Sequence, residues 1–488
     1  MIHTVESLPQ ADLLLHSLRS VGYSEEAAIA DIVDNSISAD ASNVYVNFDW
    51  DNQILSIVDD GEGMRENELY KNMQIGSFDP QGERSKNDLG RFGMGMKTAA
   101  FSLGRKLIVL SKRNGKISNA SWDLDQVKNL GWKLLVDDSD QYNHYLKNCE
   151  VHGTAIIISK LDNLIDTSDL KKSKSHFYKV INQVEKHLQL VFHRFITEDQ
   201  LNIYVNGNGP LEPWDPFVLN NSATQELSDE DIWDLEYKTC THIQPYVIPH
   251  KTMYLSDDEY EKAEGDKGWY RNQGIYLYRN RRLIIYGTWF DLIKKDPVYN
   301  LARIRIDISA DADKDWKIDI KKSRASMPVY MREKVMSAIE DCTSRSMKTF
   351  NSRGTYSKHG GSQPLLDFVW EQVRNDGYYS FKLNKKHPLL MNIRKQLDDD
   401  GIQQLQAYLS LVENFAPYMK NGLINMANSN NEHKEEKKKK DLKEIQRFII
   451  TFHKNGFSKE DIKNTILNMA AYSYLKDQVI SMLEEIND

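Results

Sequence analysis

The stretch LGRFGMGMKTAAFSLG (89–104) places three glycines, Gly90, Gly93 and Gly95, within six positions and follows them with Lys97 and Thr98. A glycine-rich turn that enters a helix lets backbone N–H groups approach a ligand closely, and a helix N-terminus favours negative charge. The stretch therefore favours phosphate as a ligand. Its spacing does not fit a Walker A loop, and the polar, turn-rich residues before it, GSFDPQGERSKND (76–88), do not form the buried strand of a dinucleotide-binding fingerprint. A tight turn before a packed helix explains the same residues, so the upstream sequence must decide between the two interpretations.

The segment ADIVDNS (30–36) carries the first upstream signal. We expect it to be helical, with Ser24 as the N-cap, so Asp31 and Asn35 lie one turn apart on the same face. An amide oxygen together with triphosphate oxygens suits Mg²⁺, and a carboxylate one turn away suits a group that orients or deprotonates an attacking water. Taken alone, an exposed polar helix face explains the pair equally well.

The segment VDDGEGM (58–64) carries the second signal. Asp59 ends an apolar strand, and Gly61 and Gly63 allow the backbone to turn back toward a ligand. An ionised carboxylate only accepts hydrogen bonds, which suits the exocyclic amine of adenine. A simple hairpin turn is the alternative.

Length and composition set the frame for these motifs. A chain of 488 residues is expected to form two or three domains, and no window approaches the roughly 18 consecutive apolar residues of a membrane helix. We therefore expect a soluble, cytoplasmic protein without membrane contact. The three cysteines carry no metal-ligand spacing and are expected to be buried thiols. Residues 268–354 hold 18 Lys and Arg against 10 Asp and Glu, whereas the whole chain carries a net charge of −8. This segment is either a solvated face or a surface for a polyanion.

The periodicity predicts an α+β protein in three segments. Residues 1–197 are expected to hold a sheet with a hairpin at 43–58, further strands at 106–112 and 154–161, and a closing helix near 176–195. Residues 198–355 are expected to form a second sheet, with helices on one face, from strands at 201–207, 274–287, 302–309 and 316–322, followed by a helix from Pro328. Residues 356–488 are expected to be mostly helical, with a charged segment near 430–447.

Taken in order, the motifs resemble those of the GHKL ATPases, which include gyrase B subunits, the ninety-kilodalton heat-shock chaperones, histidine kinases and MutL proteins. The resemblance implies a Bergerat-fold α/β sandwich that binds ATP and Mg²⁺, with Asn35 on the metal and residues 76–90 as a lid. In HGTAIIIS (152–159), Thr154 stands where the family helps Asp59 to hold adenine. Asp31 replaces the glutamate of the hydrolytic members, so slow hydrolysis is expected. The implied ATP-binding residues are Asn35, Asp59, Gly61, Gly63, Met64, Gly90, Arg91, Phe92, Gly93, Met94, Gly95, Met96, Lys97, Thr98 and Thr154.

Within this family, residues 10–345 resemble the Microrchidia (MORC) type and its prokaryotic relatives, on the DPF turn at 215–217 and GIYLYRNRRLI (274–284). The resemblance implies a second domain similar to ribosomal protein S5 domain 2, which sends Lys321 or Lys322 to the γ-phosphate as part of the catalytic set with Asp31. It also implies an ATP-driven homodimeric clamp on DNA in a defence or restriction-modification context, with a nuclease or effector as a possible partner. The predicted DNA-contacting residues are Arg279, Arg281, Arg282 and Arg324. A protein chaperone or scaffold, or a phosphotransfer kinase, is the alternative function.

Overall fold

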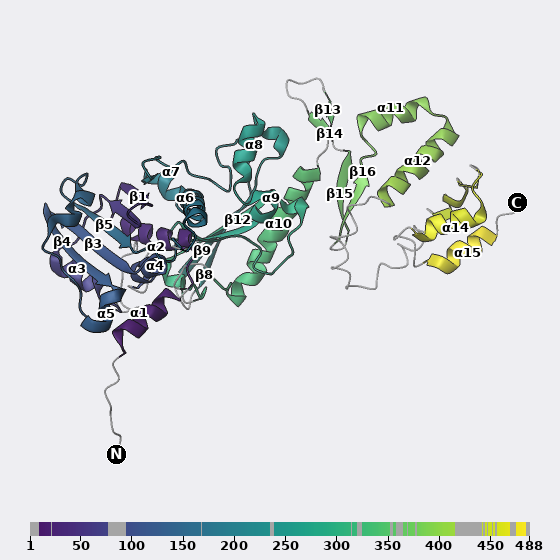
Figure 1. The fold of residues 1–488 in the computed structure, drawn as a ribbon. Coiled ribbons are helices and arrows are strands. Elements are labelled where there is room, and N and C mark those ends of the chain that lie inside the picture. The colour runs from purple at the N-terminus through teal and green to yellow at the C-terminus, as the bar shows by residue number, and fades with distance from the viewer. Residues whose placement is uncertain are drawn as a thin grey trace, which may run out of the picture. The chain divides into compact units, whose positions relative to one another are not determined.

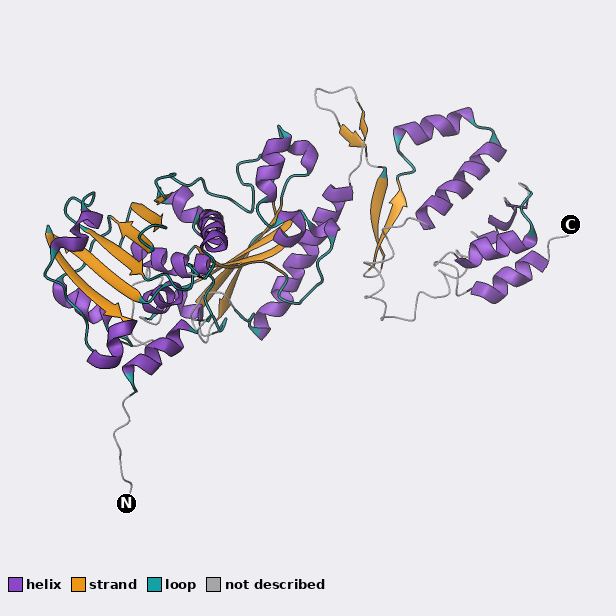
Figure 2. Cartoon of the chain, in the orientation of Figure 1, coloured by secondary structure: helices purple, strands orange, loops and turns teal. Residues whose placement is uncertain are grey.

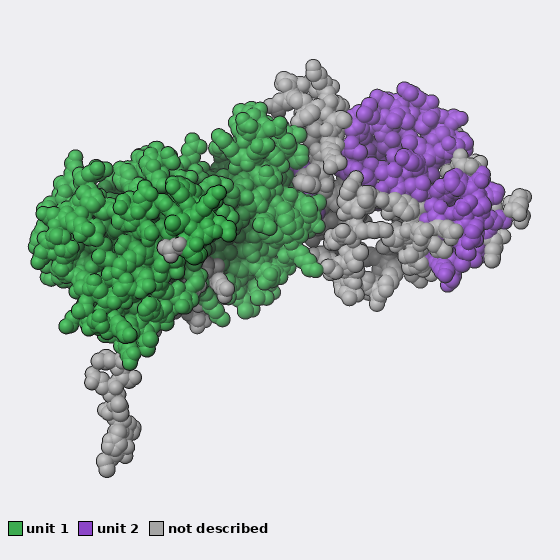
Figure 3. All heavy atoms as spheres, viewed as in Figure 1, with its two compact units in different colours: residues 1–346 green, residues 347–488 purple. Residues whose placement is uncertain are grey.

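The computed structural model describes most of the chain. The described residues are 9–20, 22–76, 94–166, 168–234, 239–313, 315–319, 325–351, 355–357, 365–367, 369–375, 378–414, 442, 445–446, 448–450, 452–453, 456–468 and 475–484. The chain divides into two compact units, residues 1–346 and 347–488 (Figure 3).

The first sheet of unit 1 has the strand order β4–β3–β5–β2–β1–β6 (Figure 1). Neighbouring strands are antiparallel except for β1 and β6, which run parallel. The predicted hairpin at 43–58 and the predicted strands at 106–112 and 154–161 are confirmed. The strands are β1 (Asn43–Asp49), β2 (Ile54–Asp59), β3 (Lys106–Arg113), β4 (Lys116–Asp123), β5 (Gly153–Ser159) and β6 (Asn202–Val205).

Helices cover one face of this sheet and bury its main core (Figure 2). Ile32 and Phe101 pack there beside Val46 and Ile158 of the strands. A smaller apolar cluster on Val58, Ile108 and Ile157 includes Leu146 of η1. The first domain is therefore a sheet with a helical layer, as predicted. Its helices are α1 (Ala11–Arg19), α2 (Glu25–Ser38), α3 (Glu66–Met73), α4 (Gly95–Leu103), α5 (Leu124–Leu130), η1 (Asp140–Leu146), α6 (Leu170–Val191) and α7 (His193–Glu198).

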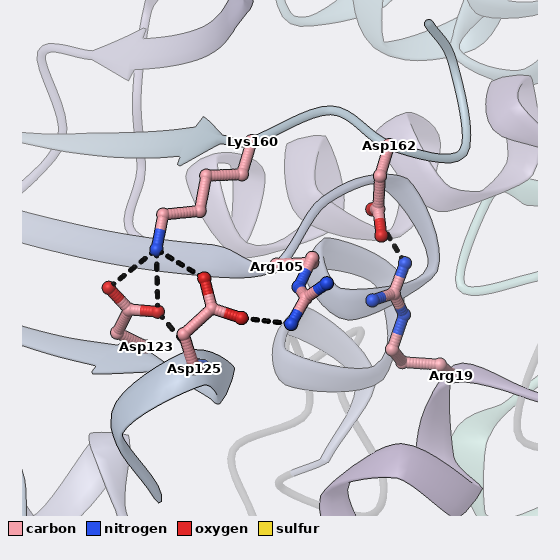
Figure 4. Close-up of polar contacts among 6 residues, drawn as sticks. All are labelled: Arg19, Arg105, Asp123, Asp125, Lys160 and Asp162. Carbon is pink, nitrogen blue, oxygen red and sulfur yellow. Dashed lines mark hydrogen bonds and ion pairs between the residues drawn. The ribbon is translucent and has the colours of Figure 1, made fainter. Parts of the chain in front are cut away.

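Ion pairs tie the ends of three strands and two helices together beside this core (Figure 4). Lys160, directly after β5, donates to Asp123 at the end of β4 at 3.0 Å and to Asp125 of α5 at 2.6 Å. Arg105, directly before β3, also pairs with Asp125, and Arg19 at the end of α1 pairs with Asp162 at 2.6 Å. These contacts fix the loops at one end of the sheet.

The second sheet of unit 1 has the order β11–β10–β12–β9–β7, in which β8 also pairs with β9. The part of unit 1 built on this sheet is called the second domain here, and the part built on the first sheet is called the first domain. Helix α10 packs against the second sheet, as the distance of 3.1 Å between Cys342 Sγ and the carbonyl oxygen of Tyr246 in β9 shows. The elements are β7 (Gln225–Glu226), β8 (Glu230–Asp234), β9 (Thr239–Val247), η2 (Lys251–Met253), α8 (Asp257–Glu264), α9 (Gly268–Asn272), β10 (Gly274–Arg279), β11 (Arg282–Thr288), η3 (Pro297–Tyr299), β12 (Ala302–Ile308), η4 (Ala310–Asp313), η5 (Val329–Met331) and α10 (Arg332–Asn351).

Two strand assignments differ from the prediction. The strand predicted to open the second domain at 201–207 is β6, which pairs with β1 and belongs to the first sheet. In the segment predicted as a strand at 316–322, the described part is a turn: Lys317 has a φ of +47°, and the Trp316 N–H donates to the Ala312 carbonyl at 3.0 Å. Its backbone groups bond locally, which takes them out of a sheet ladder.

Unit 2 contains, in its described residues, two strand pairs, which follow the last residues of α10, and then four helices. The strands are β13 (Thr355–Ser357), β14 (Leu365–Asp367), β15 (Trp370–Asn375) and β16 (Tyr378–Leu383), and the helices are α11 (Pro388–Gln396), α12 (Asp399–Asn414), α14 (Lys459–Asn468) and α15 (Lys476–Glu484). The pairs β13–β14 and β15–β16 were not expected, whereas the four described helices that follow them agree with the expectation of helices in this region. Most of the predicted charged segment near 430–447 lies outside the described residues.

Candidate nucleotide site

Asp59 lies at the end of β2, where three of the sequence motifs meet. The register of the sheet places Asp59 opposite Thr154 of β5. Ser36 of α2 donates its hydroxyl to Asp59 Oδ2 at 2.8 Å, and the Gly61 N–H donates to Oδ1 at 3.0 Å. The fold therefore brings the helix motif, the Asp-Gly motif and the His-Gly-Thr motif to one carboxylate.

Burial sets the chemistry of this carboxylate. Asp59 is 4% exposed, and desolvation raises its pKa from 3.8 to about 6, although hydrogen bonds from Ser36, Gly61 and the Thr154 backbone act in the opposite direction. Its donors are all neutral, so no counter-charge competes for the oxygens. Near neutral pH the group is an anionic acceptor in an apolar setting, which suits an amine donor such as that of adenine.

Ser111 of β3 belongs to the same site, and the sequence analysis missed it. Its hydroxyl lies 3.0 Å from the Thr154 hydroxyl and accepts a hydrogen bond from the Met64 N–H at 2.7 Å. The serine thus links two predicted ATP-binding residues. The alternation of the strand at 106–112 and its pairing with β5, in which Ser111 lies opposite Thr154, are the signal that identifies it.

The two glycines after Asp59 serve close backbone packing. A Cβ at Gly63, which has a φ of +64°, would lie 2.0 Å from the Lys112 carbonyl oxygen. A Cβ at Gly61 would lie 2.7 Å from the Ala39 carbonyl oxygen. The sequence predicts that both glycines let the backbone turn toward a ligand; in the structure, neighbouring backbone occupies the space beside them.

The described part of the phosphate motif forms the start of α4. Thr98 donates its hydroxyl to the Met94 carbonyl at 2.9 Å, and a Cβ on Gly95 would lie 3.9 Å from Asp31 Oδ2. Lys97 is 2% exposed, and burial lowers the pKa of its amine to about 8. Met96 packs against the first-domain core. The predicted phosphate-binding residues Gly90, Arg91, Phe92 and Gly93 lie outside the described residues.

Asp31 and Asn35 lie on successive turns of α2, as predicted, but only Asp31 is buried. Asn35 is exposed, and its side-chain amide donates to the Asp31 carbonyl at 3.1 Å. The Tyr23 hydroxyl donates to Asp31 Oδ2 at 2.7 Å, and Nη2 of Arg282 lies 3.3 Å from Oδ1. Burial, followed by the charge of Asp31, raises the pKa of Tyr23. Tyr23 therefore holds its proton and acts as a donor to Asp31.

The donor set fits a magnesium ion that the nucleotide itself brings. No group of three or more His, Cys, Asp or Glu that could hold a metal occurs among the described residues. Mg²⁺ keeps several waters and is commonly held by one or two protein oxygens plus substrate phosphates. The exposed Asn35 amide, one turn from Asp31, suits that arrangement.

The predicted DNA-contacting arginines of the second domain occupy three different settings. Arg279 is 4% exposed and pairs with Asp313 at 2.7 Å, and Arg282 is equally buried against α2. These two guanidinium groups are thus structural ion-pair partners, which corrects their assignment to a DNA-facing surface. Arg281 is partly exposed and pairs with Asp199. Arg324 and the predicted γ-phosphate lysines, Lys321 and Lys322, lie outside the described residues.

Comparison with known proteins finds similarity to ATPases. Residues 23–154 match the family described as histidine kinase-, DNA gyrase B- and HSP90-like ATPase. Over 118 residues the chain is 34% identical to the ATPase morc-1 of Caenorhabditis elegans, a match that covers 23% of this chain and 14% of that protein. Residues 23–154 are therefore similar to GHKL-type ATPase domains, and part of the chain is similar to a MORC ATPase. None of the described helices is long and apolar enough to cross a membrane.

Proposed function

We propose that this protein binds ATP with Mg²⁺, hydrolyses it slowly, and uses the nucleotide to close a homodimeric clamp. The observation that carries the proposal is the buried Asp59 carboxylate with its Ser36 and Gly61 donors, since it joins the motifs of the ATPase domain in one place. Adenine donates its amine to Asp59, and Thr154 lies beside it. The start of α4 and the residues before it receive the phosphates, with Mg²⁺ on Asn35 and the phosphate oxygens.

In the hydrolytic step, Asp31 accepts a proton from water as the water oxygen bonds to the γ-phosphorus. The bond between this phosphorus and the bridging oxygen breaks, and ADP and inorganic phosphate leave. Asp31 lies against the first turn of α4, which supports its place at the phosphate end. An aspartate is shorter than a glutamate by one methylene, so its reach toward water is shorter by roughly 1.5 Å, a carbon–carbon bond length. Slow turnover follows from that geometry.

The resemblance to the MORC type supports the clamp. ATP would order residues 76–90 as a lid and bring Lys321 or Lys322 of the S5-like second domain to the γ-phosphate, closing a dimer until hydrolysis opens it. The positive balance of residues 268–354 supports DNA as the target, in a defence or restriction-modification context with a nuclease or effector partner. Because Arg279 and Arg282 are buried, Arg281 and Arg324 are the remaining predicted contacts to DNA phosphates.

A protein chaperone or scaffold is the second candidate, and exposed apolar side chains favour it. Trp233 of β8 is 66% exposed and Val329 is 81% exposed, on the domain that was expected to face DNA. Binding to DNA weakens steeply with salt, whereas apolar client binding tolerates it. A phosphotransfer kinase would instead move label from the γ-phosphate onto protein.

The test is size-exclusion chromatography with light scattering on the full chain, with and without a nonhydrolysable ATP analogue and duplex DNA. We expect the mass to double from 56.6 kDa only when the analogue is present. We expect DNA to elute together with the protein at low salt but not at high salt. A monomer under all conditions contradicts the clamp. A dimer that never retains DNA at low salt favours the scaffold.

A further inference from the structure

An ion cluster joins the second domain to the helix that carries Asp31. Arg282 is the first residue of β11 and directly follows a turn in which Asn280 and Arg281 both have positive φ values, +46° and +70°. This tight turn holds the guanidinium at the tip of the β10–β11 hairpin. From there it reaches α2, whose carboxylates are about 250 residues earlier in the chain.

The contacts of Arg282 are specific in geometry. Nε lies 3.0 Å from both carboxylate oxygens of Asp34, and Nη2 lies 3.3 Å from Oδ1 of Asp31. Nη1 donates to the Leu283 carbonyl at 3.0 Å, and the guanidinium lies 6.0 Å from the centre of the Phe192 ring. A planar guanidinium with fixed N–H directions holds two carboxylates in defined orientations, which a lysine ammonium does less well.

Burying one cation and two carboxylates costs desolvation free energy, so the cluster is a poor means of stabilising the fold. The side chains of Arg282, Asp31 and Asp34 are 5%, 2% and 2% exposed. Buried ion pairs are seldom more stable than apolar side chains of similar volume, because each charge must be desolvated. Two neighbouring carboxylates one turn apart also repel each other without a cation between them. The cluster therefore suits a functional role next to the reacting carboxylate better than a purely stabilising one.

Both oxygens of Asp31 are oriented, one from each domain. Tyr23 of the first domain bonds Oδ2, and Arg282 of the second domain contacts Oδ1. We propose that Arg282 is a positioning residue for hydrolysis: it fixes the Asp31 carboxylate against the first turn of α4 and makes turnover depend on the docked second domain. The inference rests on the proposed role of Asp31 in hydrolysis. Arg282, which lies outside the ATPase motifs, thus takes part in ATP hydrolysis.

The test compares two charge-balanced double variants of the full chain. Arg282→Gln with Asp34→Asn removes the cation and one carboxylate, and keeps polar side chains of similar size at both positions. The control is Arg194→Gln with Asp307→Asn, which removes an ion pair of 2.6 Å that also joins the two domains, from α7 to β12, without touching Asp31. Single variants Arg282→Ala and Arg282→Lys complete the set, and thermal melting by circular dichroism verifies that each protein folds.

We expect Arg282→Gln with Asp34→Asn to lower kcat by about 10- to 100-fold, the scale of a misplaced catalytic group, with the Kd for a nonhydrolysable ATP analogue within about threefold of the parent. Arg282→Lys is expected to recover part of kcat, and the control pair to hydrolyse ATP at the parental rate. A folded Arg282→Gln, Asp34→Asn protein with parental kcat overturns the inference and leaves the proposed function standing. Equal losses of kcat in the test and control pairs also overturn it, because any interdomain ion pair would then suffice. A parent that binds ATP but never hydrolyses it defeats the proposed hydrolysis first, and the inference with it.

Discussion

Asp59 and Asp31 are equally buried, each 4% exposed, yet their surroundings differ in kind. Asp59 is held by neutral donors from its own domain, the Ser36 hydroxyl and the Gly61 N–H. Asp31 is held by a phenol and by the guanidinium of Arg282 from the second domain. The comparison separates two tasks. A carboxylate with neutral donors is suited to accept a hydrogen bond from a ligand, whereas one with a cation from another domain is suited to respond to domain position.

The largest expected effect is on turnover at the Asp31 end. Asp31→Ala removes the group that takes the proton from water, so we expect kcat to fall by about 10²- to 10⁴-fold. Release of phosphate at saturating ATP measures this loss. If Asp31→Ala hydrolyses ATP at the parental rate, another group is the base, and the contrast between the two aspartates loses its catalytic half.

The next effect is on the backbone that shapes the Asp59 end. Gly63→Ala places a Cβ 2.0 Å from the Lys112 carbonyl and keeps a left-handed φ, so we expect the free energy of unfolding to fall by about 2–5 kcal/mol. Gly115 is the matched control, since its φ is +77° and a Cβ there meets nothing within 4 Å. Gly115→Ala is expected to cost about 1–2 kcal/mol. Urea titration measures both, and equal losses would show that the close packing at Gly63 is unimportant.

A smaller effect concerns pH. Burial raises the pKa of Asp59 to about 6, so the carboxyl becomes protonated, and loses its anionic acceptor, as the pH falls through about 6. We expect ATP affinity to fall by about fivefold between pH 6 and pH 5, because the ionised fraction of a single group with a pKa of about 6 falls from about one half to about one eleventh. The Asp59→Asn variant keeps every other titratable group, and ATP itself titrates equally in both experiments. The difference between the affinity–pH curves of the parent and the variant is therefore due to Asp59. Parallel curves for the parent and Asp59→Asn would contradict the assignment.

The same shift predicts a stability difference of defined sign. Because the folded-state pKa of Asp59 lies above its unfolded value of 3.8, its contribution to stability is fully present below about pH 4 and is lost as the pH rises through about 6. Without ligand, Asp59→Asn is therefore expected to be more stable than the parent at pH 7 and to lose this advantage near pH 4. Urea titrations at the two pH values measure the difference. An Asn variant that is less stable than the parent at pH 7 would contradict burial as the cause of the shift.

The motif residues at both ends of the site were predictable from the sequence, whereas the contacts that Ser111 and Arg282 add to them were not. Asp59, Gly61 and Thr154 follow from short motifs and from alternation along strands that pair in simple order. The contact between Arg282 and Asp31 spans 251 residues, and no local pattern encodes it. Counting charges over 268–354 placed Arg279 and Arg282 on a surface, because a count does not distinguish a buried ion pair from an exposed cation. The parallel pairing of β6 with β1 was not predicted either, because strand order depends on contacts between residues far apart in the chain.

We propose that the two aspartates have separate roles, Asp59 in adenine binding and Asp31 in hydrolysis. Calorimetric titration of Mg·ATP into the parent, Asp31→Ala and Asp59→Asn tests this separation. The parent and Asp31→Ala are expected to bind with the same affinity, because the Asp31 carboxylate matters only when water attacks. Asp59→Asn exchanges an acceptor for a mixed amide, which is expected to cost about 1–3 kcal/mol, or one to two decades in Kd. Unchanged affinity for Asp59→Asn, or loss of binding in Asp31→Ala, would contradict the account.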